Sequence, residues 1–129
     1  MNKTWIKAGI AAAVLLSGAA AYAGYKASIG APSISPTFAV GIMGAARATA
    51  DTNSYAGCSV LNSGTSSLGF CTIADATGAT KTCSFSSAAM VQAVASITPN
   101  SAIRLFFDAS GNCTQLYIDT YSFYLPATP

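Results

Sequence analysis

Four cysteines are the residues of this chain whose type and spacing most clearly predict chemistry: Cys58, Cys71, Cys83 and Cys113. No two of them form a Cys-x2-Cys pair, and the chain has no histidine, so neither a four-cysteine nor a mixed zinc site is expected. Four cysteines in a short exported chain instead predict two disulfide bonds. The sequence therefore predicts covalent cross-links, with no metal ion and no other cofactor.

One turn pattern occurs twice and predicts two hairpins. The segments 75–78 and 108–111 both begin with aspartate and end with glycine. The aspartate carboxylate can accept hydrogen bonds from backbone N–H groups two residues on, and glycine adopts the positive φ that such a loop requires. Both segments therefore fit the three-residue hairpin loop that combines a type I turn with a glycine bulge.

The first of these hairpins sets the predicted pairing of the cysteines. Its loop geometry places Cys71 opposite Cys83. If the polar segment 62–67 forms a symmetric loop, Cys58 faces Cys71 in a non-hydrogen-bonded pair, whose shorter Cα–Cα distance of roughly 4.5 Å suits a disulfide. The sequence therefore predicts a bond between Cys58 and Cys71, which leaves Cys83 to pair with Cys113.

Alternation of apolar and polar residues predicts the strands that carry these positions. An edge strand is expected around 25–29, inside an extended arm. The other expected strands span residues 37–43, 55–62, 68–74, 80–85, 102–107 and 112–124. In the strand over 102–107, the inward face is expected to consist of Ile103, Leu105 and Phe107.

One helix is predicted between the strands. It begins after a serine N-cap at position 86 or 87 and ends near residue 97. Its apolar face would pack on the sheet and consists of Met90, Val91, Val94 and Ile97. The segment 45–53 is ambiguous: its alanines permit a helical turn, but we favour a surface turn with a weak ion pair between Arg47 and Asp51.

Residues 1–23 have the pattern of a secretory signal peptide. Lys3 and Lys7 precede a short apolar run over 8–16, and small residues precede a cleavage site before Gly24. A retained membrane anchor is the alternative, which we disfavour because the run is at the short limit for spanning a bilayer. The prediction is an exported protein, periplasmic or extracellular, with an extended arm over 24–36 and a single disulfide-bonded β domain over 37–129.

Cleavage would leave a chain of balanced charge. The remaining charged side chains are Lys26, Arg47, Lys81 and Arg104 against Asp51, Asp75, Asp108 and Asp119. A nucleic-acid partner is not expected because there is no basic patch. Stable membrane insertion is not expected after cleavage. Low charge also weakens the repulsion between copies, so self-association is a reasonable expectation.

An enzyme is the weakest class, and no catalytic residue is assigned. A hydrolytic triad lacks its usual base because there is no histidine. The aspartates are mostly explained as turn or surface residues, and a single carboxylate per turn is too few for a calcium site. A hydrolase therefore stays a remote alternative.

Aromatic residues alternate with a carboxylate near the end of the chain. Such a face can stack on sugars or peptides, but we favour packing under the N-terminal arm or a second sheet. If the rings form one exposed patch, a surface for a glycan, a protein ligand or self-assembly becomes the better interpretation. The residues of this possible binding surface are Tyr117, Asp119, Tyr121, Phe123 and Tyr124.

Several short segments carry a resemblance to known proteins. They are Ala46-Arg47 with Ala50-Asp51, Tyr55-Ala56-Gly57-Cys58, Phe70-Cys71, Asp108-Ala109-Ser110-Gly111-Asn112-Cys113, and Tyr121-Ser122-Phe123-Tyr124-Leu125-Pro126. With these segments the chain resembles small secreted disulfide-containing bacterial proteins of no assigned function. The resemblance implies one exported, disulfide-bonded domain and no particular activity.

The predicted fold class is mainly β. We expect an antiparallel sandwich or curled sheet of about six to seven strands with one short α-helix. The leading hypothesis for function is a small exported, non-enzymatic module for binding or association with the cell envelope. The alternative is a structural subunit that assembles with copies of itself through edge strands.

Overall fold

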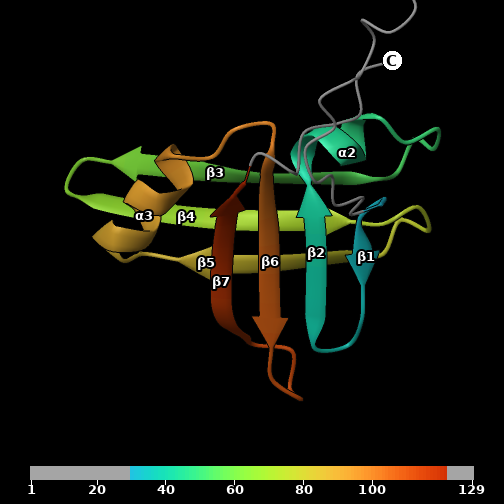
Figure 1. Cartoon of the computed structure of the whole chain (residues 1–129). Helices are drawn as coiled ribbons and strands as arrows, with labels where there is room; N and C mark the ends of the chain where they lie inside the picture. The colour runs from blue at the N-terminus through green and yellow to red at the C-terminus, as the bar shows by residue number, and fades with distance from the viewer. Residues whose placement is uncertain (1–29, 122–129) are drawn as a thin grey trace, which may run out of the picture.

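The computed structural model describes residues 30–121, which form two antiparallel sheets packed face to face (Figure 1). One sheet has four strands in the order β1-β2-β6-β7, and the other has three in the order β3-β4-β5. The predicted mainly β fold is confirmed. The strands are β1 Ser33–Ile34, β2 Phe38–Ile42, β3 Tyr55–Ser63, β4 Ser66–Ala74, β5 Thr80–Phe85, β6 Ser101–Phe107 and β7 Cys113–Thr120.

The strands of the two sheets run crosswise, as in sandwiches with orthogonally packed sheets (Figure 1). The four-stranded sheet covers only part of the three-stranded sheet, and helix α3 (Ala88–Ala95) packs on the remaining end of β3 and β4. The predicted helix is confirmed: Ser87 is its N-cap, and the Ser87 hydroxyl accepts a hydrogen bond from the backbone N–H of Met90 at 3.3 Å. Val94 and Ile97 pack against the core.

The core lies between the sheets and is built from both. All three residues of the predicted inward face of β6 are buried, which confirms that prediction. On β2 the inward positions are small, and a Cβ added at Gly41 would lie 2.7 Å from the Cβ of Ala56. This close approach needs glycine. The buried core cluster consists of Ala39, Cys71, Ile73, Cys83, Ile103, Leu105 and Phe107.

Both predicted aspartate–glycine loops are confirmed. Gly78 and Gly111 each have φ +84°. The Asp75 N–H donates to the carbonyl of Ala79 at 3.1 Å, and the equivalent bond from Asp108 measures 3.0 Å. The loops therefore close the hairpins β4–β5 and β6–β7 at the predicted residues.

The predicted six-residue loop over 62–67 is wrong. Strand β3 continues to Ser63, β4 begins at Ser66, and only Gly64 and Thr65 separate them. Gly64 has φ +59° at the first central position, so a two-residue hairpin turn forms and the polar flanking residues stay in the sheet. The register between β3 and β4 is still as predicted, because the predicted six-residue loop and the observed two-residue turn have the same centre, between Gly64 and Thr65.

The favoured surface turn over 45–53 is confirmed for residues 48–53, but the predicted ion pair between Arg47 and Asp51 is wrong. Residues Met43–Arg47 form the short helix α2, and Arg47 is exposed. The Asp51 carboxylate instead accepts hydrogen bonds from the backbone N–H groups of Asn53 and Ser54, at 2.9 and 2.6 Å. These local donors replace the predicted ion pair with Arg47; within residues 30–121 the salt bridge is between Arg104 and Asp119.

Several predictions concern the ends of the chain. The signal peptide and the strand around 25–29 lie outside the described residues, and so does the part of the last predicted strand beyond residue 121. The predicted arm contributes strand β1, which pairs antiparallel with β2, and strand β7 ends at Thr120. Between residues 30 and 121, no helix has the length and apolar character needed to cross a bilayer.

Candidate functional site

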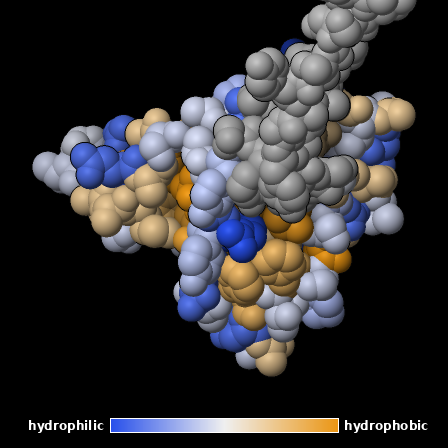
Figure 2. All heavy atoms as spheres, in the orientation of Figure 1, coloured by the Kyte–Doolittle hydropathy of each residue, from blue (hydrophilic) through white to orange (hydrophobic). Residues whose placement is uncertain are grey.

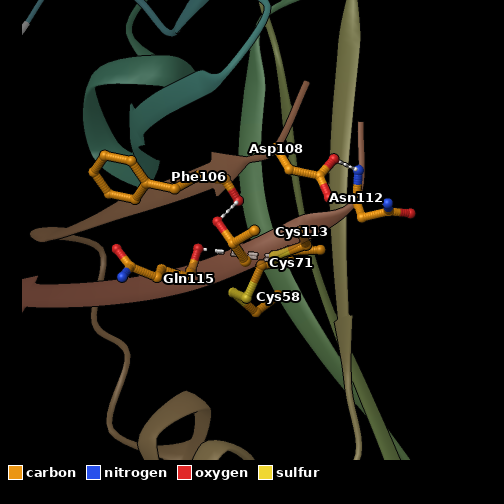
Figure 3. Close-up of a disulfide and its surroundings, with 9 residues drawn as sticks. Cys58, Cys71, Phe106, Asp108, Asn112, Cys113 and Gln115 are labelled. Atoms are coloured by element: carbon orange, nitrogen blue, oxygen red, sulfur yellow. Dashed lines mark hydrogen bonds between the residues drawn. A yellow bond between two sulfur atoms is a disulfide. The ribbon is translucent and has the colours of Figure 1, made fainter. Parts of the chain in front are cut away.

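Three cysteines lie in a row across β3, β4 and β5, because Cys71 is in register with both Cys58 and Cys83. The predicted pairing is confirmed: Cys58 bonds to Cys71 with a Cα–Cα distance of 4.0 Å, and Cys83 bonds to Cys113 with 5.2 Å. The first disulfide joins neighbouring strands. The second joins β5 to β7 and so links the two sheets, near the first (Figure 3). Disulfides persist in oxidising surroundings, so the protein belongs in a non-reducing environment.

A β-bulge allows Cys113 to reach the facing sheet. Phe106 pairs with Gln115 and Phe107 pairs with Cys113, so Thr114 is the extra residue. The Thr114 hydroxyl donates to the carbonyl of Phe106 at 3.2 Å, which holds the bulge (Figure 3). Strict alternation would put Cys113 on the same face as Tyr117, but the bulge turns it inward toward Cys83.

Three aromatic rings cross the outer face of the four-stranded sheet, and we call them the aromatic row: Phe38 on β2, Phe106 on β6 and Tyr117 on β7. The ring centroids of Phe38 and Phe106 are 4.9 Å apart, and those of Phe106 and Tyr117 are 5.5 Å apart. Tyr117 is 47% exposed. Figure 2 shows hydrophobic surface on this face beside strongly hydrophilic groups.

An ion pair borders the aromatic row. The Arg104 Nε donates to Oδ2 of Asp119 at 2.7 Å, and the Arg104 Cζ lies 5.9 Å from the centroid of the Tyr117 ring. This cation over the ring face restrains Tyr117. The Asp119 carboxylate is thus held by a cation of its own sheet, and its side chain is only 17% exposed.

The predicted binding surface is brought together only in part. Tyr117 and Tyr121 are about half exposed, at 47% and 51%, and arm residues 24–29, under which these rings were expected to pack, lie outside the described residues. Phe123 and Tyr124 lie outside the described residues. The sequence reasoning missed Phe38 and Phe106, which lie on other strands. Phe106 alternates with the inward-facing residues of β6, and this alternation could have assigned it to the outer face of the sheet.

The aspartates of the turns are tied to their own loops. A backbone hydrogen bond from Ser54 is the main cause that lowers the pKa of Asp51 to about 2. The Thr77 hydroxyl lowers the pKa of Asp75, and the Asn112 side chain lowers that of Asp108. Carboxylates held ionised in this way are poor general acids at neutral pH. Across residues 30–121, no three side chains of metal-binding type come together.

These lowered pKa values predict a loss of stability in acid. Because the pKa of Asp51 in the fold, about 2, lies below its ordinary 3.8, the ionised form stabilises the fold above that ordinary value. The contribution disappears as pH falls toward 2. We expect the melting temperature to fall over this interval, and Asp51→Asn to reduce the fall. Thermal unfolding of both proteins between pH 2 and 7 checks this, and equal falls in the two proteins would contradict it.

An open groove of about 380 Å³ runs beside β7. It lies where β7, the edge of the four-stranded sheet, passes β5 and helix α3. The Cys83–Cys113 disulfide forms part of its wall. Among the described residues, the lining is uncharged and consists of Cys83, Ser84, Phe85, Met90, Cys113, Thr114, Gln115, Leu116 and Tyr117.

Comparison with known proteins gives no match that could identify the role of this groove or of the aromatic row. No family model matches the chain, and neither a curated protein nor a solved structure matches it.

Proposed function

We propose that this chain is a small exported, non-enzymatic module, associated with the cell envelope or its surroundings, that binds a neutral glycan on the aromatic row. The observation that carries the proposal is one row of neighbouring aromatic rings on the outer face of a sheet, ending in an exposed tyrosine. Contiguous exposed apolar surface on a small protein commonly marks an interaction site.

The chemistry of the aromatic row favours a sugar ligand. Aromatic rings provide flat apolar area at low entropic cost, and the tyrosine hydroxyl adds a polar group at the rim. The charges next to Tyr117 are those of Arg104 and Asp119, which neutralise each other. A ligand on this face therefore contacts aromatic rings and hydrogen-bonding groups but no net charge. Such a surface suits a neutral glycan better than a charged one.

Export and lack of catalysis are supported by separate observations. Two disulfides need an oxidising compartment, and the first residues have the signal-peptide pattern. Among the residues described, each aspartate is engaged in a turn or an ion pair, and the chain has no histidine. These observations disfavour the remote hydrolase alternative.

Replacing Tyr117 by alanine tests the proposed ligand surface. We expect about tenfold weaker binding to the glycan selected from an array, because central aromatic anchors carry a large share of binding energy. The matched control is Tyr55→Ala, which removes a tyrosine of similar exposure, 49%, from β3 of the other sheet.

The two variants separate the outcomes. Loss of binding in Tyr117→Ala with unchanged binding in Tyr55→Ala supports the proposal. Equal loss in both, or capture of a protein instead of any glycan on the aromatic row, overturns the glycan assignment.

A further inference from the structure

We infer that the groove beside β7 receives an extended strand from a second copy of this chain, and that the strand is the segment 24–29, which we call the arm strand. The groove shares Tyr117 with the aromatic row, but the inference rests on the open edge of β7 and does not depend on glycan binding. It gives a structural basis to the alternative of a self-assembling subunit.

The edge of the sheet determines the shape of the occupant. β7 pairs with β6 on one side, and no described strand pairs with its other side. An unpaired strand edge presents backbone N–H and C=O groups in a row, which an extended polypeptide matches by adding one more strand. β7 also lacks the lysine and proline that commonly protect such edges.

The lining of the groove determines the side chains of the occupant. Phe85, Met90 and Leu116 provide apolar walls, and all three are only partly buried. Because the described lining of the groove carries no charged group, side chains entering it should be uncharged and apolar, at alternate positions of the added strand.

The arm strand has this pattern. Tyr25, Ala27 and Ile29 alternate with Lys26 and Ser28, and the segment contains no proline. An added strand can therefore turn its three apolar residues into the groove and its two polar residues to solvent. The predicted cleavage before Gly24 would make this segment a free chain end.

Distance favours a second copy over the same chain. The described chain begins at Gly30, shortly before β1, and β1 and β7 are the opposite edges of the four-stranded sheet (Figure 1). The groove lies beside β7. Four strand spacings of roughly 4.8 Å separate β1 from that position, or roughly 19 Å. Six extended residues span at most roughly 20 Å. The arm strand could reach its own groove but would have no length left to lie along β7.

The resulting contact is heterologous. Each copy donates at the β1 edge and accepts at the β7 edge, so repetition of the contact produces a ring or an open-ended chain of copies. The balanced charge of residues 24–129 presents little repulsion to such assembly.

Light scattering of the exported chain 24–129 at several concentrations tests the inference. We expect oligomers that grow with concentration, and a chain lacking residues 24–29 that stays monomeric. A synthetic peptide of sequence GYKASIGA, residues 24–31, should bind this shortened chain and, in excess, convert the oligomers of the longer chain to monomers. A scrambled peptide should do neither.

A groove variant and its control complete the test. Met90→Glu places a charge in the groove, and we expect more than about tenfold weaker peptide binding. Gln92→Glu adds the same charge to an exposed position of α3 outside the groove and should leave binding unchanged. A monomeric chain 24–129, undiminished assembly without residues 24–29, or equal effects of the two substitutions would each overturn the inference.

Discussion

Replacing Cys83 and Cys113 together by alanine is expected to lower the free energy of unfolding by about 3.5 kcal/mol. The bond closes a loop with a sequence separation of 30 and joins β5 to β7, so its loss frees the unfolded chain and removes a covalent link between the sheets. Against a typical total of about 5–15 kcal/mol, this loss is large. Guanidinium unfolding followed by circular dichroism measures it.

The other disulfide provides the comparison. Cys58 and Cys71 are separated by 13 residues on strands that a hairpin already joins, so the double alanine variant should lose only about 3 kcal/mol. A larger loss for this pair than for Cys83 and Cys113 would show that the contact between the sheets does not depend on the second bond.

Gly41→Val is expected to destabilise the fold by about 3 kcal/mol. The first added carbon would lie 2.7 Å from the Cβ of Ala56 and 3.5 Å from Cγ2 of Ile73, on the facing sheet. Because both neighbours belong to the packed interior, the sheets must separate to admit the side chain. The same unfolding measurement gives the change in free energy.

Two further variants isolate the cause. Gly57 is also a strand glycine, but a Cβ added there meets no atom within 4 Å, so Gly57→Val should be neutral or slightly stabilising. Ala56→Gly should recover part of the stability lost by Gly41→Val, since it removes the nearest obstructing atom. A similar loss at both glycines would indicate that strand propensity, and not close packing, sets the cost.

Local chemistry made most of the fold predictable. The aspartate–glycine loops, the N-cap Ser87 and the alternation of β6 all act between residues near in sequence, and each was predicted correctly. In segment 45–53 the predicted ion pair was wrong, because the Asp51 carboxylate accepts hydrogen bonds from the backbone of Asn53 and Ser54 instead of pairing with Arg47.

The candidate surface was less predictable than the fold. The pattern within a single strand identified Tyr117 and Asp119, but it could not predict which strands lie beside them in the sheet. Phe38 joins the aromatic row only because β2 pairs with β6 across more than 60 residues of chain, at Phe38 opposite Phe106. The ion pair of Asp119 was missed for the same reason, since its partner Arg104 lies on the neighbouring strand β6.

By itself, the amino-acid sequence determined the two aspartate–glycine loops, the register of β3, β4 and β5 and hence the row of three cysteines, because turn residues and side-chain alternation act over a few bonds. Only the tertiary structure decided how the sheets stack, where Thr114 bulges out to turn Cys113 inward, and which edge of β7 has no described partner strand. Those features depend on contacts between residues far apart in the chain, and no local pattern encodes the free energy of such contacts.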